Sequence, residues 1–278
     1  MHSTLGWLLL LGPTLASTQD FSFLVMSDPQ FGMYTENREF AQETANFSFA
    51  IATANRLHPA FVVVCGDLTN KAADPAQVAE YQRVAHLLHR SIPLHNVPGN
   101  HDVGNQPTPE SLAAYRRNYG ADYYTFRQSG FEGIVLNSSL IQHPEQAPQE
   151  AAKQEAWIEN ELRQAQVQGV GKVVVFQHIP WFLITADEPD QYFNIPTTTR
   201  ARYLAMFEKY GVHEVFAGHY HRNAEGRSPN LRVTTTGPVG KPLGVDPSGM
   251  RIVTVKSGSF ESQYYGFGNL PNQIGLPR

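Results

Sequence analysis

Cysteine is almost absent from this 278-residue sequence, which contains Cys65 alone. A single cysteine cannot form an intramolecular disulfide, so the fold must depend on packing, with or without help from bound metal. We interpret Cys65 as a small buried hydrophobic residue, because it ends an apolar segment. The eleven histidines supply potential metal ligands instead.

An excess of basic residues is also missing. Lys and Arg number 21 against 25 Asp and Glu, which gives a formal net charge of −4. Without a basic stripe the chain cannot displace the counterions of a phosphate backbone, so we exclude nucleic acid as a bulk partner. With 41% hydrophobic and 17% charged residues, the composition excludes a disordered, coiled-coil or collagen-like chain.

Long hydrophobic runs are lacking as well. No segment reaches the roughly 20 apolar residues that span a bilayer, so no membrane span is expected. Residues 1–16 contain no Asp, Glu, Lys or Arg, include the run Leu-Gly-Trp-Leu-Leu-Leu-Leu and end in Thr-Leu-Ala. This pattern is typical of a signal peptide, and it predicts a secreted or periplasmic protein. The alternative is a buried N-terminal strand, and the oligomeric state is not determined by the sequence.

Strand-like and helix-like segments alternate along the rest of the chain. Apolar or β-branched runs predict strands at residues 21–26, 61–65, 94–97, 133–136, 173–176 and 214–216. Apolar residues three and four positions apart predict helices at residues 40–54, 77–90, 109–119 and 151–168. Residues 231–236 and 251–255 predict two more strands, joined by a Gly/Pro-rich turn without a helix. The pattern predicts a layered α/β fold with a second or mixed sheet, as one domain over residues 20–265 with a C-terminal tail at 266–278.

Polar residues with metal-ligand chemistry follow five of these strands. In chain order the segments are Ser-Asp-Pro-Gln at 27–30, Gly-Asp-Leu-Thr-Asn at 66–70, Gly-Asn-His-Asp at 99–102, Gln-His at 177–178 and Gly-His-Tyr-His at 218–221. Each segment alone is more typical of a turn or a helix cap. Because ligands of α/β sheets gather at the carboxyl ends of strands, the set together predicts one site. Its mixed oxygen and nitrogen donors suit divalent Mn, Fe or Zn.

The order and content of these segments resemble the calcineurin-like metallophosphoesterase superfamily. The blocks of that superfamily are Asp-x-His, Gly-Asp-x-x-Asn/Asp, Gly-Asn-His-Asp/Glu, a lone His and Gly-His-x-His, and four of the five match here between Asp28 and His221. Within it, the chain is similar to the group of calcineurin-like phosphoesterase-domain-containing protein 1, which also has Asp-Pro-Gln in the first block. The resemblance implies an α/β, metallophosphoesterase-type four-layer sandwich, with two mixed β-sheets flanked by helices.

The resemblance also implies how two divalent metal ions (Mn, Fe or Zn) would be held. One ion would bind Asp28, Asp67 and His221, and the second would share Asp67 and bind the side chains of Asn100, His178 and His219. Two such ions lower the pKa of a shared water and clamp a phosphoryl group. His101 resembles the general acid of the family, and Asn70 and Asp102 resemble the groups that orient it.

Gln30 departs from the superfamily pattern. It replaces the histidine of the first block, so it offers at best a neutral carbonyl oxygen as a metal ligand. The first metal site should therefore be weaker, or should favour harder ions. We favour an active enzyme over a decayed one, because the other ligand positions and His101 are present.

These residues predict a metal-dependent phosphoesterase that attacks phosphate monoesters with a hydroxide bridging the two metals. The group that the chain resembles implies phosphoserine or phosphothreonine and a cytoplasmic location, whereas a secreted enzyme would meet phosphorylated small molecules. A phosphodiesterase acting on cyclic nucleotides or other diesters, and a metal-poor interaction scaffold, remain the alternatives. Residues 185–196, rich in Asp, Pro and aromatic side chains, are either a substrate rim or a structural surface loop.

Overall fold

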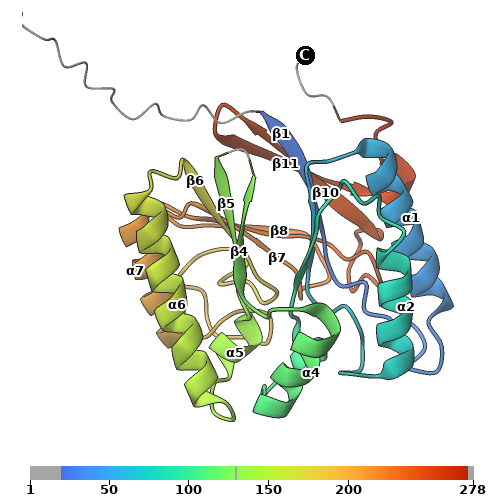
Figure 1. Ribbon diagram of the computed structural model, residues 1–278, viewed down its shortest axis with the longest axis horizontal. Helices are drawn as coiled ribbons and strands as arrows, with labels where there is room; N and C mark the ends of the chain where they lie inside the picture. The colour runs from blue at the N-terminus through green and yellow to red at the C-terminus, as the bar shows by residue number, and fades with distance from the viewer. Residues whose placement is uncertain (1–19, 129, 275–278) are drawn as a thin grey trace, which may run out of the picture.

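Two β-sheets lie face to face in the computed structural model, and helices cover the outer face of each (Figure 1). The structure describes residues 20–128 and 130–274; the predicted signal peptide at residues 1–16 lies outside them. The order of one sheet is β11-β10-β1-β2-β3, and that of the other is β4-β5-β6-β7-β9-β8. Both sheets contain parallel and antiparallel pairs, which confirms the predicted four-layer sandwich.

The first sheet is built around β1. Its strands are β1 (Phe21–Met26), β2 (Val62–Cys65), β3 (Leu94–Val97), β10 (Gly249–Lys256) and β11 (Ser259–Gly266). Both faces of β1 are covered: Phe23 and Val25 point toward the second sheet, and Leu24 and Met26 point toward the helices. A strand covered on both sides is apolar at most positions, as in the run Phe-Ser-Phe-Leu-Val-Met; the hydroxyl of its one polar residue, Ser22, lies 3.1 Å from Thr254 Oγ1.

The second sheet is also mixed, with parallel and antiparallel neighbours. Its strands are β4 (Tyr124–Gln128), β5 (Phe131–Val135), β6 (Lys172–Phe176), β7 (Glu214–Ala217), β8 (Ala224–Arg227) and β9 (Arg232–Thr235). The helices of the protein are α1 (Ala41–Leu57), α2 (Pro75–Ala85), α3 (Asn100–Val103), α4 (Pro109–Tyr119), α5 (Ser138–Gln142), α6 (Pro148–Val167) and α7 (Thr197–Tyr210), with a 3-10 turn at Phe267–Asn269.

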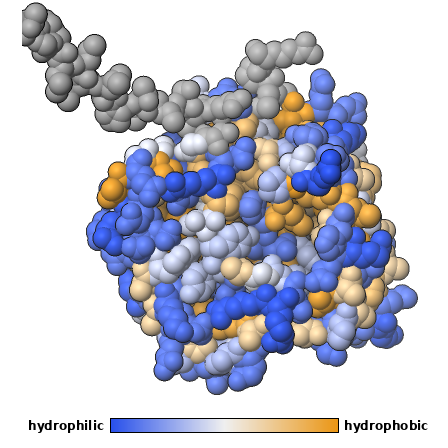
Figure 2. Space-filling view, in the orientation of Figure 1, coloured by the Kyte–Doolittle hydropathy of each residue, from blue (hydrophilic) through white to orange (hydrophobic). Residues whose placement is uncertain are grey.

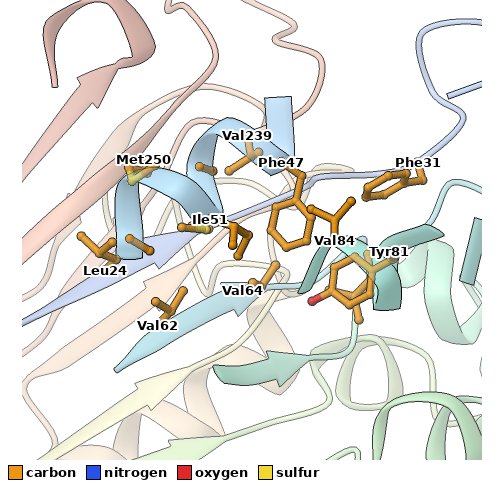
Figure 3. Packing of buried hydrophobic residues seen from close by; sticks show 14 of the residues in the cluster. Leu24, Phe31, Phe47, Ile51, Val62, Val64, Tyr81, Val84, Val239 and Met250 are labelled. Carbon is orange, nitrogen blue, oxygen red and sulfur yellow. The ribbon is translucent and has the colours of Figure 1, made fainter. Parts of the chain in front are cut away.

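Hydrophobic clusters fill the three spaces between the layers. Phe47 and Ile51 of α1 pack with Tyr81 of α2 over Val64 of the first sheet (Figure 3). Phenylalanines and valines fill the space between the sheets, and a third cluster joins α6 and α7 to the second sheet. Leu270 and Ile274, in the predicted tail, pack against the first cluster.

Several predicted boundaries were wrong. The helix predicted at 77–90 is α2, which begins at Pro75 because the Asp74 carboxylate accepts the N–H groups of Ala76 and Gln77. It ends at Ala85. Just beyond this end, the side-chain amide of Asn55 in α1 donates a hydrogen bond to the Leu87 carbonyl (2.8 Å). The strands predicted at 231–236 and 251–255 are β9 and β10, which lie in different sheets. The sequence did not predict β4, β8, β11, α7 or the short helices α3 and α5.

Hydrophilic residues cover most of the face seen in Figure 2, and apolar ones are scattered among them. Among the residues that the structure describes, none of the helices is long and apolar enough to cross a membrane.

Candidate metal centre

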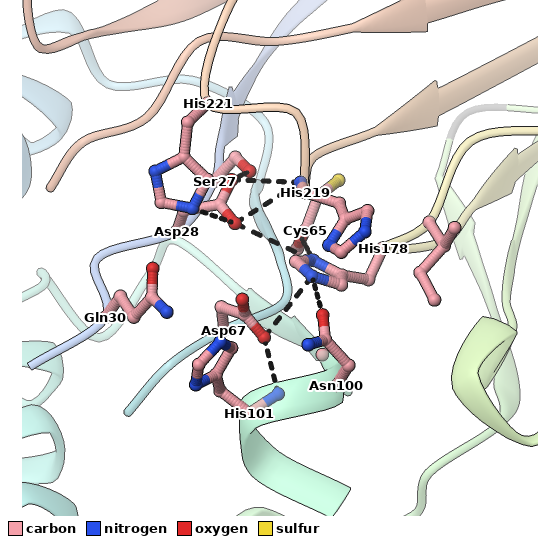
Figure 4. Close-up of polar contacts among 12 residues, drawn as sticks. Ser27, Asp28, Gln30, Cys65, Asp67, Asn100, His101, His178, His219 and His221 are labelled. Carbon is pink, nitrogen blue, oxygen red and sulfur yellow. Dashed lines mark hydrogen bonds and ion pairs between the residues drawn. The ribbon is translucent and has the colours of Figure 1, made fainter. Parts of the chain in front are cut away.

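The predicted ligand segments meet at one edge of the two sheets. Strands β1, β2 and β3 run parallel in the first sheet, as do β6 and β7 in the second, so their carboxyl ends come together. The structure brings together all seven predicted ligand residues, which are labelled in Figure 4: Asp28, Gln30, Asp67, Asn100, His178, His219 and His221. Their side chains are buried, with at most 5% exposure.

Two groups of side chains in this site could each hold a metal ion. Asp67, His178 and His219 have ligand atoms within 4.8 Å of one another, and so do Asp28, Asp67 and His221. Asp67 belongs to both groups. Asn100 adds an amide oxygen to the first group, since its Oδ1 lies 3.0 Å from His178 Nε2. These are the two sets that the resemblance implied.

Backbone carbonyls fix the orientation of the three histidines. The contacts are His178 Nδ1 to Cys65 O (2.8 Å), His219 Nε2 to Tyr192 O (3.1 Å) and His221 Nδ1 to Lys241 O (2.7 Å). A carbonyl oxygen only accepts, so in the neutral form of each ring the bound nitrogen carries the proton and the other nitrogen offers its lone pair. Metal-binding histidines are oriented in this way in proteins. The donor set therefore fits divalent metal ions.

The backbone at the site adopts conformations that non-glycine residues rarely adopt. Five ligand residues have positive φ: Asp28 (49°), Gln30 (41°), Asp67 (48°), His219 (68°) and His221 (53°). Such a conformation costs about 1–2 kcal/mol per residue. Strain concentrated at one place in a fold is typical of a functional site. Position 99 has no room for a side chain, because a Cβ there would lie 2.1 Å from the Asp67 backbone nitrogen.

The charges of the metal-free site depend on Asp67 and its neighbours. Burial alone would raise the pKa of Asp67, but His178 and His101 lie close enough to lower it well below its usual value. Burial lowers the pKa of His178, yet the Asp67 carboxylate 3.3 Å from Nε2 outweighs this and raises it to about 9. Burial and the nearby His178 lower the pKa of His219 to about 4, so His219 is neutral, as a metal ligand must be.

His101 is held beside Asp67 by two contacts. Its backbone N donates to Asp67 Oδ1 (2.9 Å), and its Nδ1 donates to the Asn70 carbonyl (2.8 Å). Asn70 thus contacts His101 through its main chain. The Asp102 carboxylate does not contact the His101 ring; it accepts backbone N–H groups from Leu68, Thr69 and Gly99. Asp102 therefore joins the loops after β2 and β3, and burial together with the Asp67 charge raises its pKa to about 7.

Gln30 lies beside the site with its amide oxygen buried (Figure 4). Its Nε2 donates to Asn70 Oδ1 (3.1 Å), whereas its Oε1 is buried without a hydrogen-bond partner among the described residues. An unpaired buried oxygen is costly, and a cation would satisfy it. The position thus fits the neutral oxygen ligand that the sequence predicted.

The sequence did not identify three residues that orient the side chains of this site. Tyr192 and Lys241 supply the carbonyls that orient His219 and His221. Asn105 accepts the Asn100 Nδ2 hydrogen at 2.9 Å, which turns the Asn100 oxygen toward His178. A carbonyl comes from any residue type, so the sequence carries no signal for the first two. Arg222, between β7 and β8, donates from its Nε to Leu243 O in the loop between β9 and β10 (2.9 Å).

Comparisons with known proteins agree with this geometry. A family model described as calcineurin-like phosphoesterase matches residues 21–223. The human protein named serine/threonine-protein phosphatase CPPED1 is 36% identical over 266 residues, covering 90% of this chain and 85% of its own. The Danio rerio protein of the same name is 35% identical over 267 residues, covering 90% and 86%. A purple acid phosphatase from yellow lupin shares the fold, with a TM-score of 0.68 at 14% identity over 92% of this chain and 53% of its own.

Proposed function

This chain belongs to the calcineurin-like phosphoesterase family, and on that basis we propose that it hydrolyses phosphate monoesters, phosphoserine and phosphothreonine among them, with two divalent metal ions. Membership makes it a hydrolase of phosphoric ester bonds. The names of the relatives, serine/threonine-protein phosphatase, favour the phosphorylated amino acids as substrates.

One observation carries the proposal: two ligand groups share Asp67, and each histidine in them has one nitrogen held by a carbonyl. A bridging carboxylate is a natural way to hold two cations about 3.5–4 Å apart. We assign Asp28, Gln30 and His221 to one ion and Asn100, His178 and His219 to the other. When bound, such ions lower the pKa of a water molecule and neutralise charge on a phosphoryl group.

The protein itself supplies proton transfer and orientation. His101 lies next to Asp67, and its Nδ1 proton is committed to the Asn70 carbonyl. A proton on Nε2 can therefore pass to the leaving alkoxide, and the same nitrogen can be reprotonated from water. Asp102 keeps the two loops that carry Asp67 and His101 in register through its backbone contacts.

The test is metal analysis of the purified protein followed by assays with added Mn, Fe or Zn. We expect hydrolysis of p-nitrophenyl phosphate and of phosphoserine peptides, and much slower hydrolysis of bis-p-nitrophenyl phosphate. Faster hydrolysis of the diester would make the protein a phosphodiesterase. Inactivity toward every ester with two metals bound would support a binding scaffold and overturn the proposal.

A further inference from the structure

A cavity of about 510 Å³ opens beside the candidate metal centre. Its wall combines residues from the segment after α3, the end of α5, the loop before α7 and the segment after β7: Asn105, Gln142, His143, Asp190, Gln191, Tyr192, Pro196 and His219. His219 belongs to the candidate metal centre, so the cavity borders the place where a phosphoryl group would bind. It has room for more than the phosphate itself.

The loop at residues 183–196 forms one wall and is rigidly built. The buried Glu188 carboxylate accepts the backbone N–H of Leu183 and Ile184 (2.8 Å each) and the Asn194 side chain (2.7 Å). Arg200 of α7 is fully buried, and it donates to the carbonyls of Ala186, Glu188 and Ile195. Since these contacts fix the loop before any ligand arrives, the wall is preformed.

Tyr192 presents its ring at the mouth of the cavity. The backbone carbonyl of Tyr192 binds His219, its hydroxyl lies 3.5 Å from Asn100 Nδ2, and the residue is nonetheless 59% exposed. Its ring centroid lies 4.9 Å from that of His219. An aromatic ring held this firmly and left open to solvent offers a stacking surface to a ligand. A substitution of the side chain would leave the carbonyl contact with His219 in place.

The charge of the wall sets which ligand fits. None of the residues that line the cavity in the described chain is Lys or Arg, and the exposed Asp190 carboxylate is negative. Asp190 Oδ1 accepts the N–H of Thr197, which keeps the carboxylate at the rim. The nearby Arg200 does not line the cavity; its guanidinium is buried and donates to backbone carbonyls, so it makes no direct contact with a ligand there. Further negative groups on a substrate would meet repulsion here.

We propose that this cavity binds the leaving group of the substrate and selects phosphoserine or phosphothreonine peptides that carry a basic residue next to the phosphorylated one. Tyr192 packs against the peptide, and Asp190 pairs with the basic side chain. Peptides with acidic neighbours and small esters with a second phosphate are disfavoured. This inference rests on the proposed function and adds the substrate class to it.

The test compares two phosphoserine peptides that differ only in an Arg or a Glu beside the phosphoserine. We expect the Mn-loaded protein to prefer the Arg peptide in kcat/KM. Asp190→Asn keeps an acceptor for Thr197 and should reduce that preference about 2- to 5-fold, the range of an exposed ion pair. Asp187→Asn removes the same charge from an exposed position outside the cavity and should leave the preference unchanged.

Tyr192 is tested by its own pair of substitutions. Tyr192→Ala should weaken binding of both peptides about 2- to 10-fold, while Tyr192→Phe keeps the ring and most of the affinity. Ile184→Ala removes an exposed apolar side chain of the same loop, 72% exposed and outside the cavity, and serves as the matched control. Fluorescence anisotropy with non-hydrolysable phosphonate peptides gives the affinities without turnover.

The outcomes separate the two proposals. If p-nitrophenyl phosphate is hydrolysed but Asp190→Asn and Tyr192→Ala behave like their controls, the cavity is not the leaving-group site and the inference is wrong. If the Glu peptide is preferred, the assigned substrate class is wrong. If the metal-loaded protein hydrolyses none of the esters, the proposed function itself fails, whatever the affinities of the peptides.

Discussion

His178 Nε2 lies 3.3 Å from Asp67 Oδ1, with both side chains buried where the two sheets meet. His178 follows a strand of the second sheet and Asp67 follows a strand of the first. The contact therefore joins the two halves of the sandwich at the point where both ligand groups share a carboxylate. Substituting either residue, or a group that orients it, should weaken metal binding more than it lowers the stability of the fold.

Asp67→Asn should reduce turnover at least about 100-fold, because the shared negative charge is lost while the size of the side chain is kept. Metal content, measured by mass spectrometry, should fall with it. Asp187→Asn, at an exposed position, is the control and should retain activity. Full turnover by Asp67→Asn would contradict the bridging role.

His101→Ala should slow substrates with poor leaving groups by about 10²- to 10⁴-fold, because their alkoxides need a proton. p-Nitrophenyl phosphate, whose leaving group is a weak base, should be affected less. Steady-state kinetics with alkyl and p-nitrophenyl esters measure the difference. Equal losses for both would argue against a general acid at this position.

Asn105→Ala should weaken metal binding about 10- to 100-fold, since Asn105 holds the Asn100 amide in its ligand orientation. Asn105→Asp keeps an acceptor for the Asn100 Nδ2 hydrogen and should retain more of the affinity. Titration with a competing chelator gives both values. Equal affinity for the alanine variant and the natural protein would show that Asn105 does not position the amide.

Gly99→Ala should destabilise the fold by about 1–3 kcal/mol, because the new Cβ would lie 2.1 Å from Asp67 N. Backbone atoms cannot move aside as a flexible side chain can. Gly268→Ala is the matched control, since a Cβ there has no atom within 4 Å. Thermal unfolding should show a lower Tm for Gly99→Ala alone, and equal Tm values for the two variants would contradict this account.

His95 should make the protein less stable in mild acid. Burial lowers its pKa from 6.5 to about 4, and its ring stacks on Phe126 with centroids 3.7 Å apart. The unfolded chain therefore binds a proton that the folded chain does not, and stability falls as pH drops from 6.5 toward 4.

His95→Phe keeps the stacking and removes the titration. The difference in unfolding free energy between it and the natural protein should change by about 1–3 kcal/mol across this pH range, an upper bound because the ring is part-exposed. Urea unfolding at several pH values measures it, with the exposed His86→Gln as control. A constant difference would show that His95 titrates normally.

The strands that the sequence failed to predict are edge strands. The three strands that were not predicted, β4, β8 and β11, all lie at sheet edges. In β11 exposed and half-exposed residues alternate, so an apolar run is absent. The central strand β1 is buried at every position and is readily predicted. Burial on both faces creates the sequence signal, and three of the four edge strands lack it; the fourth, β3, was predicted at residues 94–97.

The candidate ligand residues could be proposed from the sequence, because five segments with carboxylate, amide or imidazole groups follow predicted strands, although each segment alone is more typical of a turn. Only the tertiary structure decided which of these residues lie close together and how each histidine ring is oriented. The carbonyls of Cys65, Tyr192 and Lys241 orient the three histidines, and any residue type supplies a carbonyl. Their positions follow from the packing of two sheets, which brings together atoms that are distant in the chain.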